Sequence, residues 1–190
     1  MWSAILLFMP APVRTPRTSW IDAGLRALGA GGPDAVRVEA LAQAIGVTKG
    51  GFYHHFADRG ELIEALLDAW ERRSTDDVLE RVEREGGDAI AKATRAGALT
   101  FSAELRDVDL AVRDWARRDE TVAARLKRVD NRRMDYLRTQ LGTVWTDEDE
   151  LEARCMIAFA VAVGTHFIAA DHGVRSRADV VASVVRLLKG

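Results

Sequence analysis

The sequence predicts an all-α protein, and two observations carry the prediction. Apolar residues recur at three- and four-residue spacing through nearly the whole chain, and no segment alternates apolar and polar side chains as a half-buried strand does. All four prolines lie at or before Pro33, so the remaining residues contain no proline to break a helix. We therefore expect a helical content far above the average of roughly one third.

The first helices are expected to be short, with glycines between them. Ile21, Leu25 and Leu28 are spaced as i, i+4 and i+7, which predicts a helix over residues 18–28. A glycine-rich stretch that runs into Pro33 ends it, because glycine accepts the left-handed cap and proline cannot continue a helix. The next helices are expected over 34–45, which Gly46 ends, over 48–56, and from 58 onward.

The helices after residue 58 are expected to be longer. Their predicted breaks are Gly86–Gly87, the stretch 106–109, Gly142 and Gly173. The expected ranges are 59–84, 87–104, 107–118, 119–141, 147–171 and 176–188.

Composition narrows the class of protein. The 190 residues include 27 Lys and Arg against 29 Asp and Glu, for a net charge of −2, which is ordinary for a globular protein and excludes disorder and fibrous repeats. Cys155 is the single cysteine, and no Cys/His spacing resembles a zinc site, so we expect no metal, no cofactor and a cytoplasmic location. The net charge also argues against a uniformly basic nucleic-acid-binding protein.

Two apolar stretches were considered as membrane or targeting segments. Residues 1–9 are apolar, but no basic residue precedes Arg14, so a flexible extension over 1–12, or a start at Met9, is favoured over a cleaved signal peptide. Residues 156–170 are shorter than the ~20 needed to span a bilayer. The sequence therefore predicts a buried helix there and no membrane partner.

A helix-turn-helix pattern is centred on Gly46. Ala42 is small enough for a second helix to cross the first closely, and Gly46 can adopt the positive φ of a sharp turn. Leu41, Ile45 and Phe52 are apolar where the two helices would face a shared core. Such a unit places its second helix in the DNA major groove, although a bare pattern also occurs in unrelated proteins.

The residues that follow the turn resemble the recognition segment of TetR-family transcriptional regulators. The segment reads Val-Thr-Lys-Gly-Gly-Phe-Tyr-His-His-Phe over 47–56, and the specific resemblance covers about residues 18–70. It implies an N-terminal three-helix DNA-binding domain over 13–60 and a larger helical ligand-binding and dimerisation domain over 61–190. Two departures are Val36–Arg37, where relatives commonly carry Ser or Thr, and Ala57, where many have Lys.

Residue chemistry and the resemblance together give a set of candidate DNA contacts. Thr48 and Lys49 open the recognition helix, whose N-terminal amides favour phosphate, and Arg37 and Arg59 open neighbouring helices. Glycines permit close backbone approach, and aromatic groups with polar tips can touch sugar, phosphate or base. His55 has an alternative role in packing against the first helix. The candidates are Arg37, Thr48, Lys49, Gly50, Gly51, Tyr53, His54, His55 and Arg59.

The larger half carries the expected dimer and effector surfaces. The helix over 147–171 is apolar on two faces, so one face needs a partner, and the resemblance implies a homodimer through the last two helices. The resemblance also implies a small-molecule effector. Six residues are candidates for binding this effector: Phe101, Trp115, Met134, Leu137, Phe159 and His166. For each of them, ordinary core packing is the alternative role.

These observations favour a non-enzymatic, ligand-responsive repressor that binds a palindromic operator as a homodimer and is released by its effector. The alternatives are a helical enzyme, for which no phosphate loop or nucleophile motif is present, and a helical scaffold with a vestigial DNA-binding head. Residues 14–59 hold six basic and four acidic groups, so the head carries +2 and the rest of the chain −4.

Overall fold

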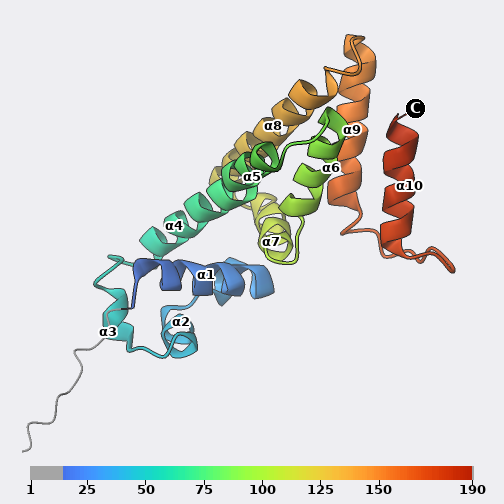
Figure 1. Cartoon of the computed structure of the whole chain (residues 1–190). Coiled ribbons are helices and arrows are strands. Elements are labelled where there is room, and N and C mark those ends of the chain that lie inside the picture. Colours follow the sequence, from blue (N-terminus) through green and yellow to red (C-terminus); the bar gives the residue numbers. More distant parts are fainter. Residues whose placement is uncertain (1–14, 190) are drawn as a thin grey trace, which may run out of the picture.

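The computed structural model describes residues 15–189, and its elements are all helical, as the sequence predicts. The head comprises α1 (Arg17–Gly31), a 3-10 turn (Pro33–Ala35), α2 (Val38–Ala44) and α3 (Lys49–Phe52). In Figure 1, α1 lies across the underside of the larger helical body, with α2 and α3 below it. The head therefore presents its two shortest helices away from the body.

Aromatic rings form the centre of the head. Trp20 and Phe52 are fully buried, and their rings meet edge to face with centroids 5.4 Å apart. Phe52 also stacks on Phe56 with centroids 5.3 Å apart, as their i, i+4 spacing favours. Because α3 is only four residues long, this packing holds it in place where its own hydrogen bonds are too few.

The body is a stack of long helices. Figure 1 shows a rod that begins with α4 and continues into α5, with α8 beside it, α9 to the right of α6 and α8, and α10 at the outer edge. Its helices are α4 (Arg59–Glu71), a π segment (Arg72–Asp76), α5 (Asp77–Glu85), α6 (Ala89–Thr100), α7 (Arg106–Ala116), α8 (Glu120–Leu141), α9 (Glu148–Gly164) and α10 (Arg177–Lys189).

Five expected helices and one expected break differ from the observed ones. The helix expected over 87–104 ends at Thr100, and the break expected over 106–109 lies inside α7, which begins at Arg106. The expected helix over 34–45 is split, because Arg37 adopts an extended conformation (φ −114°, ψ 128°) before α2 begins. The expected helix over 48–56 stops at Phe52 and continues as a turn. The expected rod over 59–84 contains the π segment, and the one over 147–171 ends at Gly164.

The early end of α9 has a visible cause in α10. The Arg177 guanidinium donates from Nη1 to the carbonyl of Thr165 at 2.5 Å and from Nη2 to the carbonyl of Ala170 at 3.3 Å. These bonds satisfy carbonyls that a longer α9 would have used within the helix. The composition of residues 165–170 alone does not predict these two hydrogen bonds from Arg177.

A buried charge cluster joins α4, α7 and α8. Asp109 on α7 is fully buried and accepts hydrogen bonds from Trp70 Nε1 at 3.3 Å, Arg113 Nε at 2.8 Å and Arg133 Nη2 at 2.8 Å. Arg113 also binds Asp130 through both Nη atoms. Burial opposes ionisation, but the charges of Arg133 and Arg113 outweigh it, so the pKa of Asp109 lies below its ordinary value.

The end helices leave apolar side chains on the surface of the chain. Only Cys155 is fully buried in α9, whereas Met156 and Ile157 are 56% and 47% exposed. Phe167, Ile168 and Leu187 are also exposed. Within the described part of the chain, no helix has both the length and the hydropathy to cross a bilayer.

Candidate nucleic-acid interface

The turn between α2 and α3 has the geometry that its glycine predicts. Gly46 has a φ of 72°, in the left-handed region, and its open side leaves nothing within 4 Å of where a Cβ would stand. The amide of Val47 donates to the carbonyl of Ala42 at 2.9 Å, which closes the turn. Since Leu41, Ala42 and Phe52 are buried, the turn brings α3 across α2 on a shared core.

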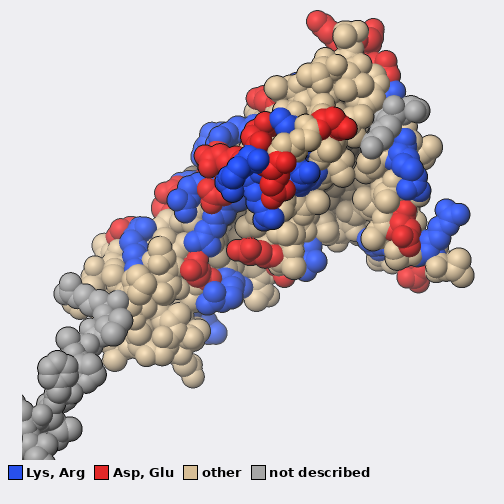
Figure 2. Space-filling model, in the orientation of Figure 1, with Lys and Arg blue, Asp and Glu red and all other residues tan. Residues whose placement is uncertain are grey.

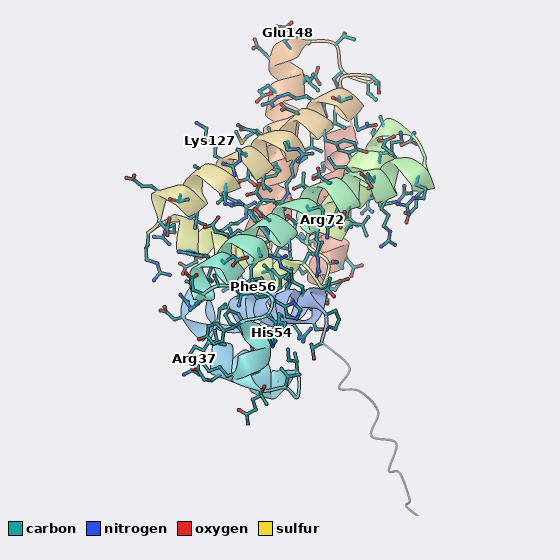
Figure 3. The ribbon with its side chains drawn as sticks, turned by 90° about the vertical axis from the view of Figure 1, so that its left-hand side faces the viewer. Arg37, His54, Phe56, Arg72, Lys127 and Glu148 are labelled. Carbon is teal, nitrogen blue, oxygen red and sulfur yellow. The ribbon has the colours of Figure 1, made fainter. Side chains whose placement is uncertain are left out.

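Five of the candidate DNA contacts lie on an exposed surface around α3. Thr48, Lys49 and Gly50 form its exposed start, and Tyr53 and His54 follow its end, with Tyr53 55% exposed. Arg37, at the start of α2, is exposed as well. Figure 3 shows Arg37 and His54 at the end of the molecule farthest from Glu148 on α9. We call the set Arg37, Thr48, Lys49, Gly50, Tyr53 and His54 the recognition face.

The other three candidates make contacts with the rest of the head, although Arg59 is itself an exposed residue. His55 is half-buried, and its Nε2 lies 2.8 Å from the carbonyl oxygen of Thr15, which corresponds to the packing alternative. Gly51 faces Trp20, whose ring would lie 4.0 Å from an added Cβ. Arg59 donates from Nε to the carbonyl of Val36 at 2.7 Å and from Nη2 to that of Pro33 at 2.5 Å.

Helices α2 and α3 lack the side-chain caps that hydroxyl residues commonly supply at the start of a helix. Neither Arg37 before α2 nor Thr48 before α3 makes a side-chain cap. In contrast, Asp58 Oδ1 accepts from the amide of Glu61 at 2.9 Å, and Glu61 Oε2 accepts from the amide of Ala57 at 2.6 Å. The second bond reaches the amide one residue before the N-cap Asp58, so the pair resembles a capping box shifted by one residue, and it ties the start of α4 to the end of the recognition face.

Sequence reasoning missed an acidic neighbour of the recognition face. Lys49 Nζ lies 2.5 Å from Oε1 of Glu39, which stands in the first turn of α2. Hydrogen bonding to Lys49 holds the pKa of Glu39 below its ordinary value, and the same bond raises the pKa of Lys49. The sequence did contain a signal for this contact, because Glu39 and Lys49 are ten residues apart. In a helix-turn-helix, that spacing brings the starts of the two helices together.

The structure distributes the six candidate effector residues over three places. Met134, Leu137 and Phe159 pack together around Cys155, and Phe101 meets His166 with ring centroids 5.0 Å apart. Burial, followed by the charge of Arg106, lowers the pKa of His166. Trp115 lies elsewhere, in a hollow of about 490 Å³ between the end of α1 and α7.

Charge is unevenly spread over the molecule. Figure 2 shows blue and red side chains gathered over the middle of the body, where α4, α5 and α8 meet, and mostly uncharged atoms on the visible face of the head. Ion pairs connect α8 to α4: Arg125 contacts Glu64, Asp68 and Glu71. Among the described residues, no group of three or more His, Cys, Asp or Glu side chains is placed to hold a metal ion.

The fold and the recognition face define a helix-turn-helix DNA-binding protein with a separate helical body. The family model described as "Bacterial regulatory proteins, tetR family" matches residues 21–66, which confirms the resemblance that the recognition segment indicated. The amino-terminal part of the chain is therefore a TetR-family domain. None of the curated proteins matches the sequence.

Solved structures of similar fold extend over the whole body. A regulatory protein of the tetR family from Rhodococcus RHA1 is 15% identical over 90% of this chain and 94% of its own, with a TM-score of 0.63. A TetR/AcrR-type transcriptional regulator from Aquifex aeolicus VF5 is 13% identical over 91% and 97%, with a TM-score of 0.68. AibR, in complex with isovaleryl coenzyme A and operator DNA, is 13% identical over 90% and 96%, with a TM-score of 0.66.

Proposed function

We propose that this protein is a ligand-responsive transcriptional repressor that binds a palindromic operator as a homodimer and releases it when a small-molecule effector binds. The observation that carries the proposal is the recognition face, which combines a helix-turn-helix with exposed polar side chains directed away from the body. The TetR-family match of residues 21–66 supports the same function. We expect no enzymatic activity and a cytoplasmic location.

Each residue of the recognition face has a proposed role. Thr48 and Lys49 would contact phosphates at the start of α3. Gly50 would let the backbone approach DNA, because it has no side chain and the space where a Cβ would stand is open apart from Thr48 Oγ1 at 3.7 Å. Tyr53 and His54 would reach sugar or base edges, and Arg37 would hold a flanking phosphate. Two of the five N–H groups of Arg59 are engaged, which leaves others for a phosphate. His55 and Gly51 would position α3 from beneath.

The homodimer is proposed to form through α9 and α10. Met156, Ile157 and Phe167 are large apolar side chains that this chain alone leaves exposed. A second copy related by two-fold symmetry would cover them and would present two recognition faces, spaced by about 34–36 Å, to a palindrome. Two heads acting together would offset the modest charge of each one.

The effector is proposed to bind within the body. Phe101 and His166 are adjacent aromatic groups, and Met134, Leu137 and Phe159 form a separate apolar cluster on α8 and α9. AibR was solved with both a small molecule and operator DNA, which supports coupling of the two sites in this fold. The coupling requires that the effector prefer the state with the lower DNA affinity.

A gel-shift assay tests the proposal. The probe is duplex DNA from upstream of the protein's own gene, titrated at two salt concentrations. We expect a specific complex that weakens with salt, and we expect Lys49→Ala and Tyr53→Ala to weaken it without changing helicity or oligomeric state. An enzyme or a scaffold with a vestigial head would form no such complex. If both substitutions left the complex unchanged, the recognition face would be assigned wrongly.

A further inference from the structure

The recognition face holds two cations, Arg37 and Lys49, and Lys49, the one that lies between residues 38 and 58, is already paired. Lys49 is the only Lys or Arg in that stretch, whereas Glu39 and Asp58 are its acids. The Lys49 side chain is 52% exposed and that of Glu39 is 67% exposed, so the pair lies on the surface. Any phosphate that approaches Lys49 therefore also meets the carboxylate of Glu39.

We propose that Glu39 is a specificity-determining residue that holds Lys49 and lowers the affinity of the head for DNA of arbitrary sequence. The proposal rests on the DNA-binding function proposed above and assigns a role to a residue outside the recognition face. Its physical basis is the 2.5 Å contact between Lys49 Nζ and Glu39 Oε1. Phosphate attraction supplies essentially all of non-specific binding, so a carboxylate paired with one of the two cations of the recognition face reduces that binding.

The effect on specific binding should be smaller. On an operator, contacts from Tyr53, His54 and the α3 backbone add to the electrostatic attraction. They can offset the free energy needed to separate Lys49 from Glu39. On arbitrary DNA these base contacts are missing, and the pair competes directly with phosphate. Glu39 would thus raise the ratio of specific to non-specific affinity, which is the quantity that matters in a genome of competing sites.

The local structure allows Glu39 to act without supporting the fold. Its neighbour Val38 is buried and anchors α2, whereas the Glu39 side chain points to solvent and Lys49. An exposed pair of this kind contributes little to stability. Glu39→Gln keeps the shape of the side chain and removes its charge, so the folded structure should persist.

A double-mutant cycle tests the proposal with full-length protein and two duplexes. One duplex carries the operator found in the upstream region, and the other is a scrambled sequence of equal length and composition. We expect Glu39→Gln to raise affinity for the scrambled duplex about threefold per head, hence about tenfold for a dimer, and to steepen the salt dependence by about 0.9 per head. Affinity for the operator should rise less.

Lys49→Met supplies the second arm of the cycle. In that background Glu39→Gln should change affinity for the scrambled duplex by less than half as much on a logarithmic scale, because its partner is gone. Glu80→Gln, an exposed glutamate on α5, is the matched control for a change of one charge. Circular dichroism and size-exclusion chromatography confirm that all variants remain folded.

The results distinguish a failure of the role proposed for Glu39 from a failure of the proposed DNA-binding function. If Glu39→Gln behaved like Glu80→Gln, or raised both affinities equally, the role of Glu39 would be refuted while DNA binding stood. An equal effect with and without Lys49 would also refute it, since general repulsion would suffice. If the wild-type protein bound neither duplex in a salt-sensitive way, the proposed function itself would fail.

Discussion

Asp109 is the residue whose loss should damage the fold most. Its carboxylate is fully buried and neutralises Arg133, which is 6% exposed, and Arg113, which is 13% exposed. Asp109→Ala would leave these guanidinium groups with Asp130 as the remaining nearby carboxylate, and Trp70 Nε1 would lose its acceptor. Breaking one side of a buried ion pair costs about 3–5 kcal/mol, and this cluster falls in that range.

Chemical denaturation followed by circular dichroism measures the cost, at a fixed protein concentration because a dimer adds mass-action stability. The control is Asp114→Ala on the same helix. Asp114 pairs with Arg118 at 2.7 Å, but its side chain is 64% exposed, so its loss should cost less than about 1 kcal/mol. If Asp109→Ala cost no more than Asp114→Ala, the buried cluster would not hold α4, α7 and α8 together.

The pH dependence gives an independent check on the same residue. The pKa of Asp109 is lower in the folded protein than its ordinary value of 3.8. Its ionised form therefore stabilises the fold fully above pH 3.8, and this contribution is lost as the pH falls toward the folded-state pKa. The difference in unfolding free energy between wild type and Asp109→Asn should shrink below pH 3.8 and stay constant from pH 5 to 7; an unchanged difference at low pH would contradict the assignment.

Three further predictions concern the head and the end helices. Arg59→Met removes the bonds to the carbonyls of Pro33 and Val36, and it should lower unfolding stability by about 1–3 kcal/mol in denaturant titration; an effect on DNA affinity alone would contradict this tie. Gly46→Ala imposes a side chain on a φ of 72° and should cost about 1–2 kcal/mol, with Gln43→Ala on exposed α2 surface as the neutral reference. Ile157→Glu places a charge on the proposed dimer surface, so light scattering should report a monomer, whereas the equivalent change at exposed Val144 should leave a dimer.

Local patterns predicted the head well because its signals are local. Gly46 is a positive-φ turn, and Phe52 and Phe56 are buried, as their sequence spacing indicated. Most of the body helices also followed from glycine breaks and helical periods, except that the single helix expected over 59–84 is α4, a π segment and α5. What the spacing could not show was that Arg37 would be extended, since nothing in its neighbours forbids a helix there.

Contacts between distant segments explain what sequence reasoning missed. Arg59 was expected at a phosphate, yet two carbonyls from residues 23 and 26 positions earlier occupy part of its guanidinium. Trp115 was expected to share an effector site with Phe101 and His166, but it lies in a hollow between α7 and the end of α1. Such partners are set by how α1, α4 and α7 pack, and a helical period says nothing about which helices meet.

The π segment between α4 and α5 determines whether the buried side chains of α5 face the same side of the rod as those of α4. The buried residue Val78 lies eight positions after the buried residue Trp70. At about 100° per residue, an unbroken α-helix would make two full turns over this distance and place Val78 about 80° past Trp70 around the helix axis. A π turn accommodates roughly one residue more than an α turn, which returns Val78 to within about 20° of the same side. The stretch Arg72–Asp76 thus acts as an α-helix with one inserted residue.

Deletion and insertion within this stretch should therefore have opposite results. Removing Arg72, which Figure 3 shows on the rod and which is exposed, would leave the two buried side chains seven positions apart and keep both facing the core. Adding a residue would instead rotate Val78 and Val82 away from their neighbours in α6. The rod can be shortened by one residue and still match the helices around it, but it cannot be lengthened by one.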